Sequence, residues 1–194
     1  MNASPTTRSR RRWILPLLGF VLLASFLPLS SCTSSVENRD PLGDIFPSTE
    51  GTSLEGQAIM LPPDEPSILL VGYVQKAQFD ADRWLVGLLQ VTPPAKILEV
   101  PAVAGLFPRL IQGTIDGGMR KGIPEEDWRS VVTCYGGAAS EILKLTGNQN
   151  PRNIRVLLLD GEGQVRWFHD RGFSAGKLLE LNQATLELVN QPHE

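Results

Sequence analysis

The stretch LLVGYVQKAQFDADRW, residues 69–84, is the part of the sequence that decides which fold is predicted. Residues 67–73 form a short and almost continuous apolar run, which is typical of a strand buried in the centre of a sheet. From Phe79 onward the apolar residues recur at helical spacing, so we predict that a helix follows the strand. A polar segment with two glutamines, residues 74–78, joins these two elements.

The predicted helix carries an apolar stripe that we expect to face the core. Its members are Phe79, Trp84, Leu85, Leu88 and Leu89. Asp80 lies in the first turn, where the helix dipole favours an anion. Pro93 and Pro94 end the helix, and residues 96–100 form a second strand that we expect Pro101 to stop. A strand–helix–strand unit of this kind predicts two parallel strands.

Outside this unit the patterns are shorter. Before it, Gly56 lies between two short apolar segments and predicts a small hairpin. After it, we predict a helix ending at Gly117-Gly118, a strand over 128–135 and a helix over 138–145. Near the C-terminus, IRVLLLDGEGQVRWFHD (residues 154–170) places a hairpin turn at 160–163 between two strand-like runs. A helix over 178–189 closes the chain.

This order of elements resembles the thioredoxin-like fold, which joins a βαβ unit to an antiparallel ββα unit. Residues 67–100 resemble the first unit and residues 154–189 the second. The opening SLEGQAIMLP resembles the hairpin that begins peroxiredoxin-like members. The resemblance implies an α/β fold: a thioredoxin-like central sheet with flanking helices, an N-terminal hairpin and a middle helical insertion.

The same resemblance points to what this chain lacks. Thioredoxin-like enzymes carry their reactive cysteine at the junction that follows the first central strand, where a helix end lowers the pKa of the thiol. Residues 74–78 hold no cysteine, and Ile154 stands where the family has a cis-proline. Three stretches, LLVGYVQKAQFDADRW, IDGGMRKGIP and LLLDGEGQVRWFHDRGFS, resemble a cysteine-poor thioredoxin-like group that is loosely similar to the mitochondrial assembly factor for the membrane sector of ATP synthase. That likeness implies assembly or chaperone work at a membrane.

The N-terminal segment has the pattern of an export signal. Four arginines (Arg8, Arg10, Arg11 and Arg12) precede an uncharged apolar run, residues 13–29, and small residues then lead to Cys32. Leu29-Ser30-Ser31-Cys32 resembles a bacterial lipobox, in which the cysteine thiol receives a diacylglycerol and becomes the new N-terminus. We therefore predict lipidation of Cys32.

These patterns divide the chain into a lipoprotein signal peptide over residues 1–31, a flexible tether over 32–45 and a thioredoxin-like domain over 46–194. An uncleaved transmembrane helix is the alternative for the apolar run, which has about the length that spans a bilayer. Pro16 and Pro28 weaken this alternative. The arginines also loosely resemble a twin-arginine export signal.

Charge and cysteine content exclude several functions. Without the four arginines the chain keeps 14 basic and 21 acidic residues, a net charge of −7, which argues against nucleic-acid binding. Of the two cysteines, Cys32 is assigned to the lipid, so Cys134 has no partner for an internal disulfide. The two histidines, His169 and His193, do not have the spacing of metal ligands. We expect neither a metal nor another cofactor.

The candidate functional residues lie at the glutamine-rich junction. We predict that Gln75, Gln78, Asp80 and Arg83 form a partner-binding edge. Cys134 is the candidate thiol, although a small buried side chain in a strand is the simpler explanation for it. His169 and Asp170 could form an acid–base pair, but adjacent strand residues point to opposite faces of a sheet.

These observations predict a lipid-anchored, redox-inactive thioredoxin-like module that binds or assembles a protein partner at the cell envelope. It would sit on the cell membrane or the outer membrane and face the periplasm or the exterior. One alternative is a single-cysteine thiol oxidoreductase that uses Cys134 with a partner thiol. A second alternative is a structural envelope lipoprotein.

Overall fold

A computed structural model of the chain describes residues 35–105 and 108–191, with the backbone alone for residues 108–111. The predicted signal peptide and the lipidation site at Cys32 lie outside the described residues. The strands are β1 Thr49–Ser53, β2 Ala58–Leu61, β3 Ser67–Gly72, β4 Lys96–Val103, β5 Val132–Tyr135, β6 Arg155–Leu159 and β7 Val165–His169. The helices are α1 Gln78–Val91, α2 Pro108–Gly122, α3 Gly137–Thr146 and α4 Ala175–Asn190, and the 3-10 turns are η1 Gln75–Ala77 and η2 Glu125–Ser130.

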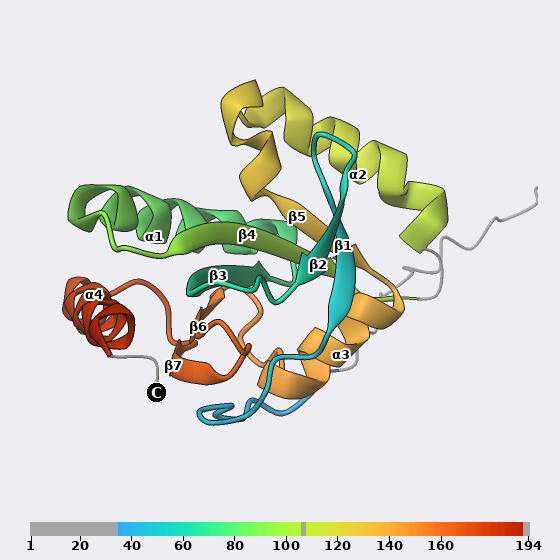
Figure 1. Cartoon of the computed structure of the whole chain (residues 1–194). Coiled ribbons are helices and arrows are strands. Elements are labelled where there is room, and N and C mark those ends of the chain that lie inside the picture. Colours follow the sequence, from blue (N-terminus) through green and yellow to red (C-terminus); the bar gives the residue numbers. More distant parts are fainter. Residues whose placement is uncertain (1–34, 106–107, 192–194) are drawn as a thin grey trace, which may run out of the picture. The chain divides into compact units, whose positions relative to one another are not determined.

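The strands of the described residues form one mixed sheet in the order β2-β1-β5-β4-β3-β6-β7. The predicted strand–helix–strand unit is present, because β3 and β4 pair in parallel from Ser67↔Lys96 to Gly72↔Pro101 around α1. The predicted C-terminal hairpin is also present, with β6 antiparallel to β7 and followed by α4. Strands β1 and β2 form the predicted N-terminal hairpin (Figure 1).

The central strands bury both of their faces in two separate cores. Along β3, Ile68 and Leu70 pack into one core, whereas Leu69 and Val71 pack into the other. Helices α1 and α4 cover the first core, and α3 covers the second, as the helices on the two sides of the sheet show (Figure 1). Because strand side chains alternate between the two faces of a sheet, a strand with a core on each side requires apolar residues at consecutive positions.

The face that α1 turns to the sheet differs from the predicted stripe. Trp84 and Leu88 are fully buried as predicted, but Phe79 is 76% exposed and Leu89 is 72% exposed. Asp80, which we expected on the surface, is only 8% exposed. The predicted apolar stripe is therefore rotated by part of a helical turn from the face of α1 that is buried. Asp80, a polar residue whose hydrogen-bond partners lie in other segments, takes one of the inward positions.

Three predicted ends of elements were also wrong. Strand β4 continues through Pro101, because the residues after the proline pair with β5. Helix α2 continues through Gly117-Gly118 to Gly122. The predicted strand over 128–135 is η2 followed by the shorter β5. Side chains on both sides of the glycine pair attach α2 to the domain. Asp116 accepts from the Tyr135 hydroxyl at 2.6 Å, and Arg120 donates to the Leu54 carbonyl at 2.7 Å.

The part of the predicted tether that the structure describes lies against the domain. The amide of Val36 donates to the Asn148 side chain at 2.7 Å, and the amide of Asn148 donates back to the Val36 carbonyl at 3.0 Å. Asn38 accepts from the buried Arg155 guanidinium at 3.0 Å and donates to Asp170 at 2.7 Å. The folded unit therefore begins before Phe46.

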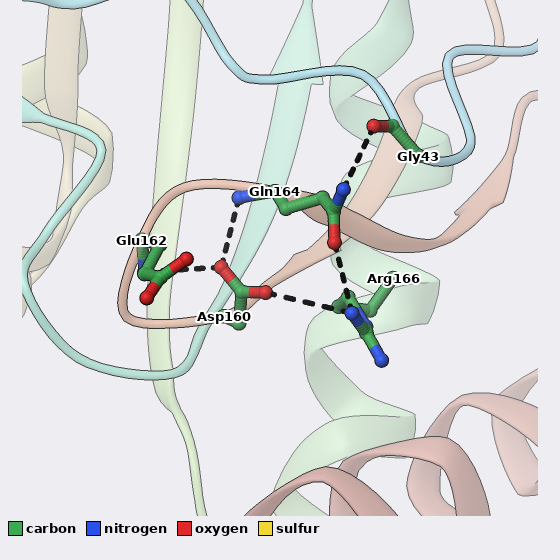
Figure 2. A network of polar contacts seen from close by, with 5 residues as sticks. All are labelled: Gly43, Asp160, Glu162, Gln164 and Arg166. Carbon is green, nitrogen blue, oxygen red and sulfur yellow. Dashed lines mark hydrogen bonds and ion pairs between the residues drawn. The ribbon is translucent and has the colours of Figure 1, made fainter. Parts of the chain in front are cut away.

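The turn of the C-terminal hairpin binds the same N-terminal segment. Figure 2 shows the Asp160 carboxylate, which accepts from the amides of Glu162 at 3.0 Å and Gln164 at 2.8 Å. The Gln164 side chain donates to the Gly43 carbonyl at 3.0 Å and accepts from Arg166 at 2.9 Å. The Asp-Gly turn that was predicted from composition thus also attaches residues far away in the sequence.

Candidate functional site

Three segments meet at one end of the central sheet. Strand β3 ends there and leads through η1 into α1, while its antiparallel neighbour β6 begins there and β7 ends there. The connections before β6 and after β7 must therefore lie beside the start of α1. This is the glutamine-rich junction at which we predicted a partner-binding edge.

The Asp80 carboxylate links the three segments through hydrogen bonds. Its Oδ2 accepts from the amide of Ile154 at 3.0 Å, and its Oδ1 accepts from the amide of Phe173 at 2.7 Å. Gly172 has a φ of +85°, a conformation that favours glycine and that precedes the Phe173 amide in the turn. Ile154 is the residue for which we predicted the position of the cis-proline of thioredoxin-like proteins. Unlike a proline it has an N–H group, and Asp80 satisfies that buried donor.

Asp80→Asn is expected to lower the free energy of unfolding by about 1.5–3 kcal/mol, as measured by urea unfolding. An asparagine amide oxygen can accept one of the two backbone N–H groups, but its NH₂ group would then face the other donor. Asp82→Asn is the matched control, since Asp82 is exposed and accepts only from the Gln78 side chain at 2.9 Å. Its expected cost is below about 0.5 kcal/mol. Equal costs for the two variants would contradict the role given to Asp80.

Around Asp80 the surface is hollowed into a cleft of about 390 Å³, which we call the basic cleft. Its lining consists of Lys76, Phe79, Asp80 and Arg83 from η1 and α1, Arg152 and Asn153 before β6, and Arg171, Gly172 and Phe173 after β7. Four of these side chains are cationic and exposed, whereas the carboxylate of Asp80 is buried. The cleft therefore presents positive charge to the solvent although the chain as a whole is acidic.

The structure separates the four predicted partner-binding residues into two pairs. Asp80 and Arg83 line the basic cleft, and Gln75 and Gln78 do not. Gln78 instead donates to Asp82 at 2.9 Å and to Glu99 of β4 at 3.4 Å. Burial raises the pKa of Glu99, and the hydrogen bond from Gln78 opposes that rise. A binding role for the four residues stays a prediction.

Sequence reasoning missed Lys76, Phe79, Arg152 and Arg171 as members of one site. Phe79 had been placed in the core stripe. Arg152 and Arg171 are far apart in the sequence. The predicted hairpin nevertheless indicates that they lie close together, because it pairs the two strands next to which they stand. The register Val156↔His169 shows that the residues just before β6 and just after β7 are neighbours.

The candidate thiol lies elsewhere. Cys134 is fully buried in the core that α3 covers, on the opposite face of the sheet from α1. Burial raises the pKa of its thiol to about 11. Cys134 thus has the environment of a small core residue, and it does not contribute to the basic cleft.

The histidine pair also has separate partners. The Nε2 of His169 donates to the Gly172 carbonyl at 2.9 Å, and its ring lies 5.9 Å from the Trp84 ring. The carboxylate of Asp170 accepts from Asn38 instead. His169 and Asp170 therefore have different hydrogen-bond partners, and no hydrogen bond joins the two side chains in the described part of the chain.

Neither a metal site nor a membrane-spanning helix is found within residues 35–105 and 108–191. No group of three or more His, Cys, Asp or Glu side chains in these ranges is placed to hold a metal ion. None of the helices described there has both the length and the apolarity to cross a membrane.

Sequence comparison finds no matching protein-family model and no matching curated protein. Solved structures do resemble the chain. One is a protein of Aquifex aeolicus VF5 that is provisionally described as an electron transport protein, with 17% identity, 77% of this chain and 99% of that chain covered, and a TM-score of 0.54. BsSco, a member of the Sco family of cytochrome c oxidase assembly proteins, has 10% identity, covers 77% and 97% of the two chains and has a TM-score of 0.53.

A third structure is a provisional protein disulfide isomerase from Bacteroides thetaiotaomicron, with 14% identity, coverage of 82% and 96% and a TM-score of 0.51. At these identities the likeness concerns the fold alone. Together with the mixed sheet and its flanking helices, it shows that the chain has a thioredoxin-like fold, as predicted.

Proposed function

We propose that the chain is a lipid-anchored, redox-inactive binding or assembly module of the cell envelope. Residues 72–84, which form the junction and the start of α1, contain no cysteine. This is the single observation that carries the proposal. A thioredoxin-like protein exchanges electrons through a thiol placed at that helix end, where the thiol pKa is lowered.

The buried carboxylate of Asp80 supports the same view. Both of its oxygens are engaged by backbone amides of other segments, so the junction is held in one arrangement. A rigid surface suits recognition, because less conformational entropy is lost on binding. The basic cleft beside Asp80 is the surface that we propose for the partner.

The alternative, a single-cysteine oxidoreductase, is tested by alkylation of Cys134. With a pKa of about 11, only about one thiol in ten thousand is ionised at pH 7. We expect iodoacetamide to modify Cys134 in the folded chain at a rate more than about a hundredfold below that in the urea-unfolded chain. Cys32→Ser removes the second thiol, so mass spectrometry reports one site. Rapid modification of the folded protein would favour the oxidoreductase.

The lipid anchor is tested at Cys32. We expect the full chain to fractionate with membranes, because each buried acyl methylene contributes about 0.8 kcal/mol and two or more chains make attachment durable. Cys32→Ala should leave an uncleaved precursor without the lipid, detected by a mass that includes residues 1–31 and lacks the diacylglycerol. Cys134→Ala is the control and should be lipidated and cleaved like the natural chain. A lipidated, cleaved Cys32→Ala chain would contradict the lipobox assignment.

The partner surface is tested by photo-crosslinking in membranes. Phe79 is replaced by a photo-crosslinking phenylalanine derivative, because this side chain is 76% exposed at the basic cleft. Leu179 of α4, 61% exposed and outside the lining of the cleft, is the matched position. We expect one defined protein adduct from position 79 and none from position 179. No adduct, or the same adducts from both positions, would leave the structural envelope lipoprotein as the better description.

Assembly is the form of binding that we favour. The resemblance of LLVGYVQKAQFDADRW and LLLDGEGQVRWFHDRGFS to the ATP synthase assembly factor group implies such work. The structural neighbour BsSco is itself described as a member of an assembly protein family. Its 10% identity carries only the fold, so the identity of any complex that this chain assembles must come from the crosslinked partner.

A further inference from the structure

We infer that the basic cleft binds an acidic segment of a partner protein that also carries an apolar side chain. This inference rests on the proposed function, because it gives the chemical class of the partner that the module would bind. The observations that support it are the charges around the cleft, the engagement of Asp80 and the exposure of Phe79.

Unpaired cations gather at the basic cleft. Elsewhere in the described part of the chain, six lysines and arginines form ion pairs with acidic residues. Arg120 and Arg155 donate to carbonyls. The described cations left without an ion pair or a side-chain hydrogen bond are Lys76, Arg83, Arg152, Arg171 and Lys121, and all but Lys121 line the cleft. Although the domain has more acidic than basic residues, these four cations form a positive surface that a ligand can reach.

The carboxylate inside the cleft does not neutralise these cations by pairing with them. Asp80 is 8% exposed, and its two oxygens accept from the amides of Ile154 and Phe173. The lining therefore carries four exposed cations and one buried anion, a net positive charge. Complementary charge on a partner steers its approach and selects it over other partners.

The shape and the aromatic residue favour a peptide segment over a small anion. The cations come from three separate segments and stand exposed around the cleft. Backbone amides that could enclose a phosphate group, those of Ile154 and Phe173, already donate to Asp80. Phe79 is 76% exposed beside the cations. An extended segment can place carboxylates on several cations and an apolar side chain on Phe79, which a free inorganic anion cannot do.

The test uses the full chain in an uncharged detergent and a displayed library of random twelve-residue peptides. We expect the selected peptides to be enriched in Asp and Glu and to contain an apolar residue. A selected peptide, synthesised with a fluorophore, should bind about tenfold more weakly when its acidic residues are changed to Asn and Gln, and its affinity should fall with added salt.

Two double variants with the same change in net charge locate the binding. Arg152→Glu with Arg171→Glu should weaken the selected peptide about tenfold or more. Lys121→Glu with Lys144→Glu should change it less than about twofold, because both residues are exposed and outside the cleft lining. Equal effects, selected peptides without acidic residues, or no selected peptide would overturn the inference. Tighter binding of inorganic phosphate than of any selected peptide would also overturn it.

A membrane surface is the competing ligand. Binding of the chain to vesicles with phosphatidylglycerol, lost in the Arg152→Glu and Arg171→Glu double variant while acidic peptides bind unchanged, would assign the charges to lipid and overturn the inference. The proposed function is judged separately. If that double variant still gives the natural crosslink from position 79, the module binds a partner but not through acidic residues. If the natural chain gives no crosslink yet binds acidic peptides, the proposed function fails, and only the preference of the basic cleft for acidic segments stands.

Discussion

Trp84→Ala is expected to lower the free energy of unfolding by about 3–5 kcal/mol, the range for the loss of a large buried aromatic side chain. Trp84 is fully buried in the core between the sheet and helices α1 and α4. Its ring makes edge contacts with Phe173 at 5.5 Å and Trp167 at 6.2 Å between centroids. Because Phe173 lines the basic cleft, this loss would also loosen one wall of the proposed site.

Trp84→Phe is the matched control, and its expected cost is below about 1.5 kcal/mol. Phenylalanine keeps most of the buried apolar surface, and it removes an indole N–H that has no hydrogen-bond partner in the structure. Unfolding in urea should be followed by circular dichroism, since the substitution removes a tryptophan from the fluorescence signal. A cost of less than about 1.5 kcal/mol for Trp84→Ala would show that the core collapses around the missing ring.

Arg155→Met is expected to lower the free energy of unfolding by about 2–4 kcal/mol, because several charged hydrogen bonds are lost at once. The side chain is fully buried at the start of β6. Its guanidinium donates to the carbonyls of Gln149 at 2.6 Å and Asn153 at 2.7 Å and to the Asn38 side chain at 3.0 Å. Burial lowers the pKa of this guanidinium, which shows the cost that these hydrogen bonds offset.

Arg155 also joins the N-terminal segment to the loop before β6. We therefore expect Arg155→Met to accelerate hydrogen exchange at the amide of Asn148, which donates to the Val36 carbonyl at 3.0 Å. Arg155→Lys should recover little of the loss, since a single ammonium group cannot reach acceptors that a planar guanidinium spans. Lys144→Met, which breaks an exposed pair with Glu141, should cost less than about 0.5 kcal/mol. Similar costs for Lys144→Met and Arg155→Met would contradict the network.

Trp84 and Arg155 stabilise the structure around the basic cleft. The Trp84 ring contacts Phe173, which lines the basic cleft, and Arg155 donates to the Asn153 carbonyl in the loop that also carries Arg152. Neither residue lines the cleft itself. Their substitution should therefore reduce partner binding through stability, whereas charge changes at Arg152 and Arg171 should reduce binding in a chain that unfolds normally.

Regular patterns in the sequence were enough to predict the fold. Three local patterns predicted elements that the structure contains. They are the apolar run of residues 67–73, the proline-ended helix after it and the Asp-Gly turn at 160–163. The predicted ends of elements were less accurate. Pro101 and Gly117-Gly118 lie inside elements because contacts with β5 outweigh their unfavourable local preference.

The structure brings together only part of the predicted candidate site, and whether that site binds a partner stays a prediction. The junction after β3 was identified from the family pattern, and Asp80 and Arg83 do lie at its cleft. Lys76, Phe79, Arg152 and Arg171 were not included, since each alone has the pattern of an ordinary surface residue or a core residue. Only the register of β6 against β7 and β3 brings them to one end of the sheet.

By itself the sequence determined the order of strands and helices, the acidic charge, the absence of a cysteine at the junction and the expectation of a lipid anchor. Tertiary structure alone decided that Asp80 is buried, that Cys134 and α1 lie on opposite faces of the sheet and that four cations share one cleft. The physical reason is that periodicity and turn chemistry act between near neighbours in the chain. Burial and electrostatic potential depend instead on residues that strand pairing brings together from distant positions.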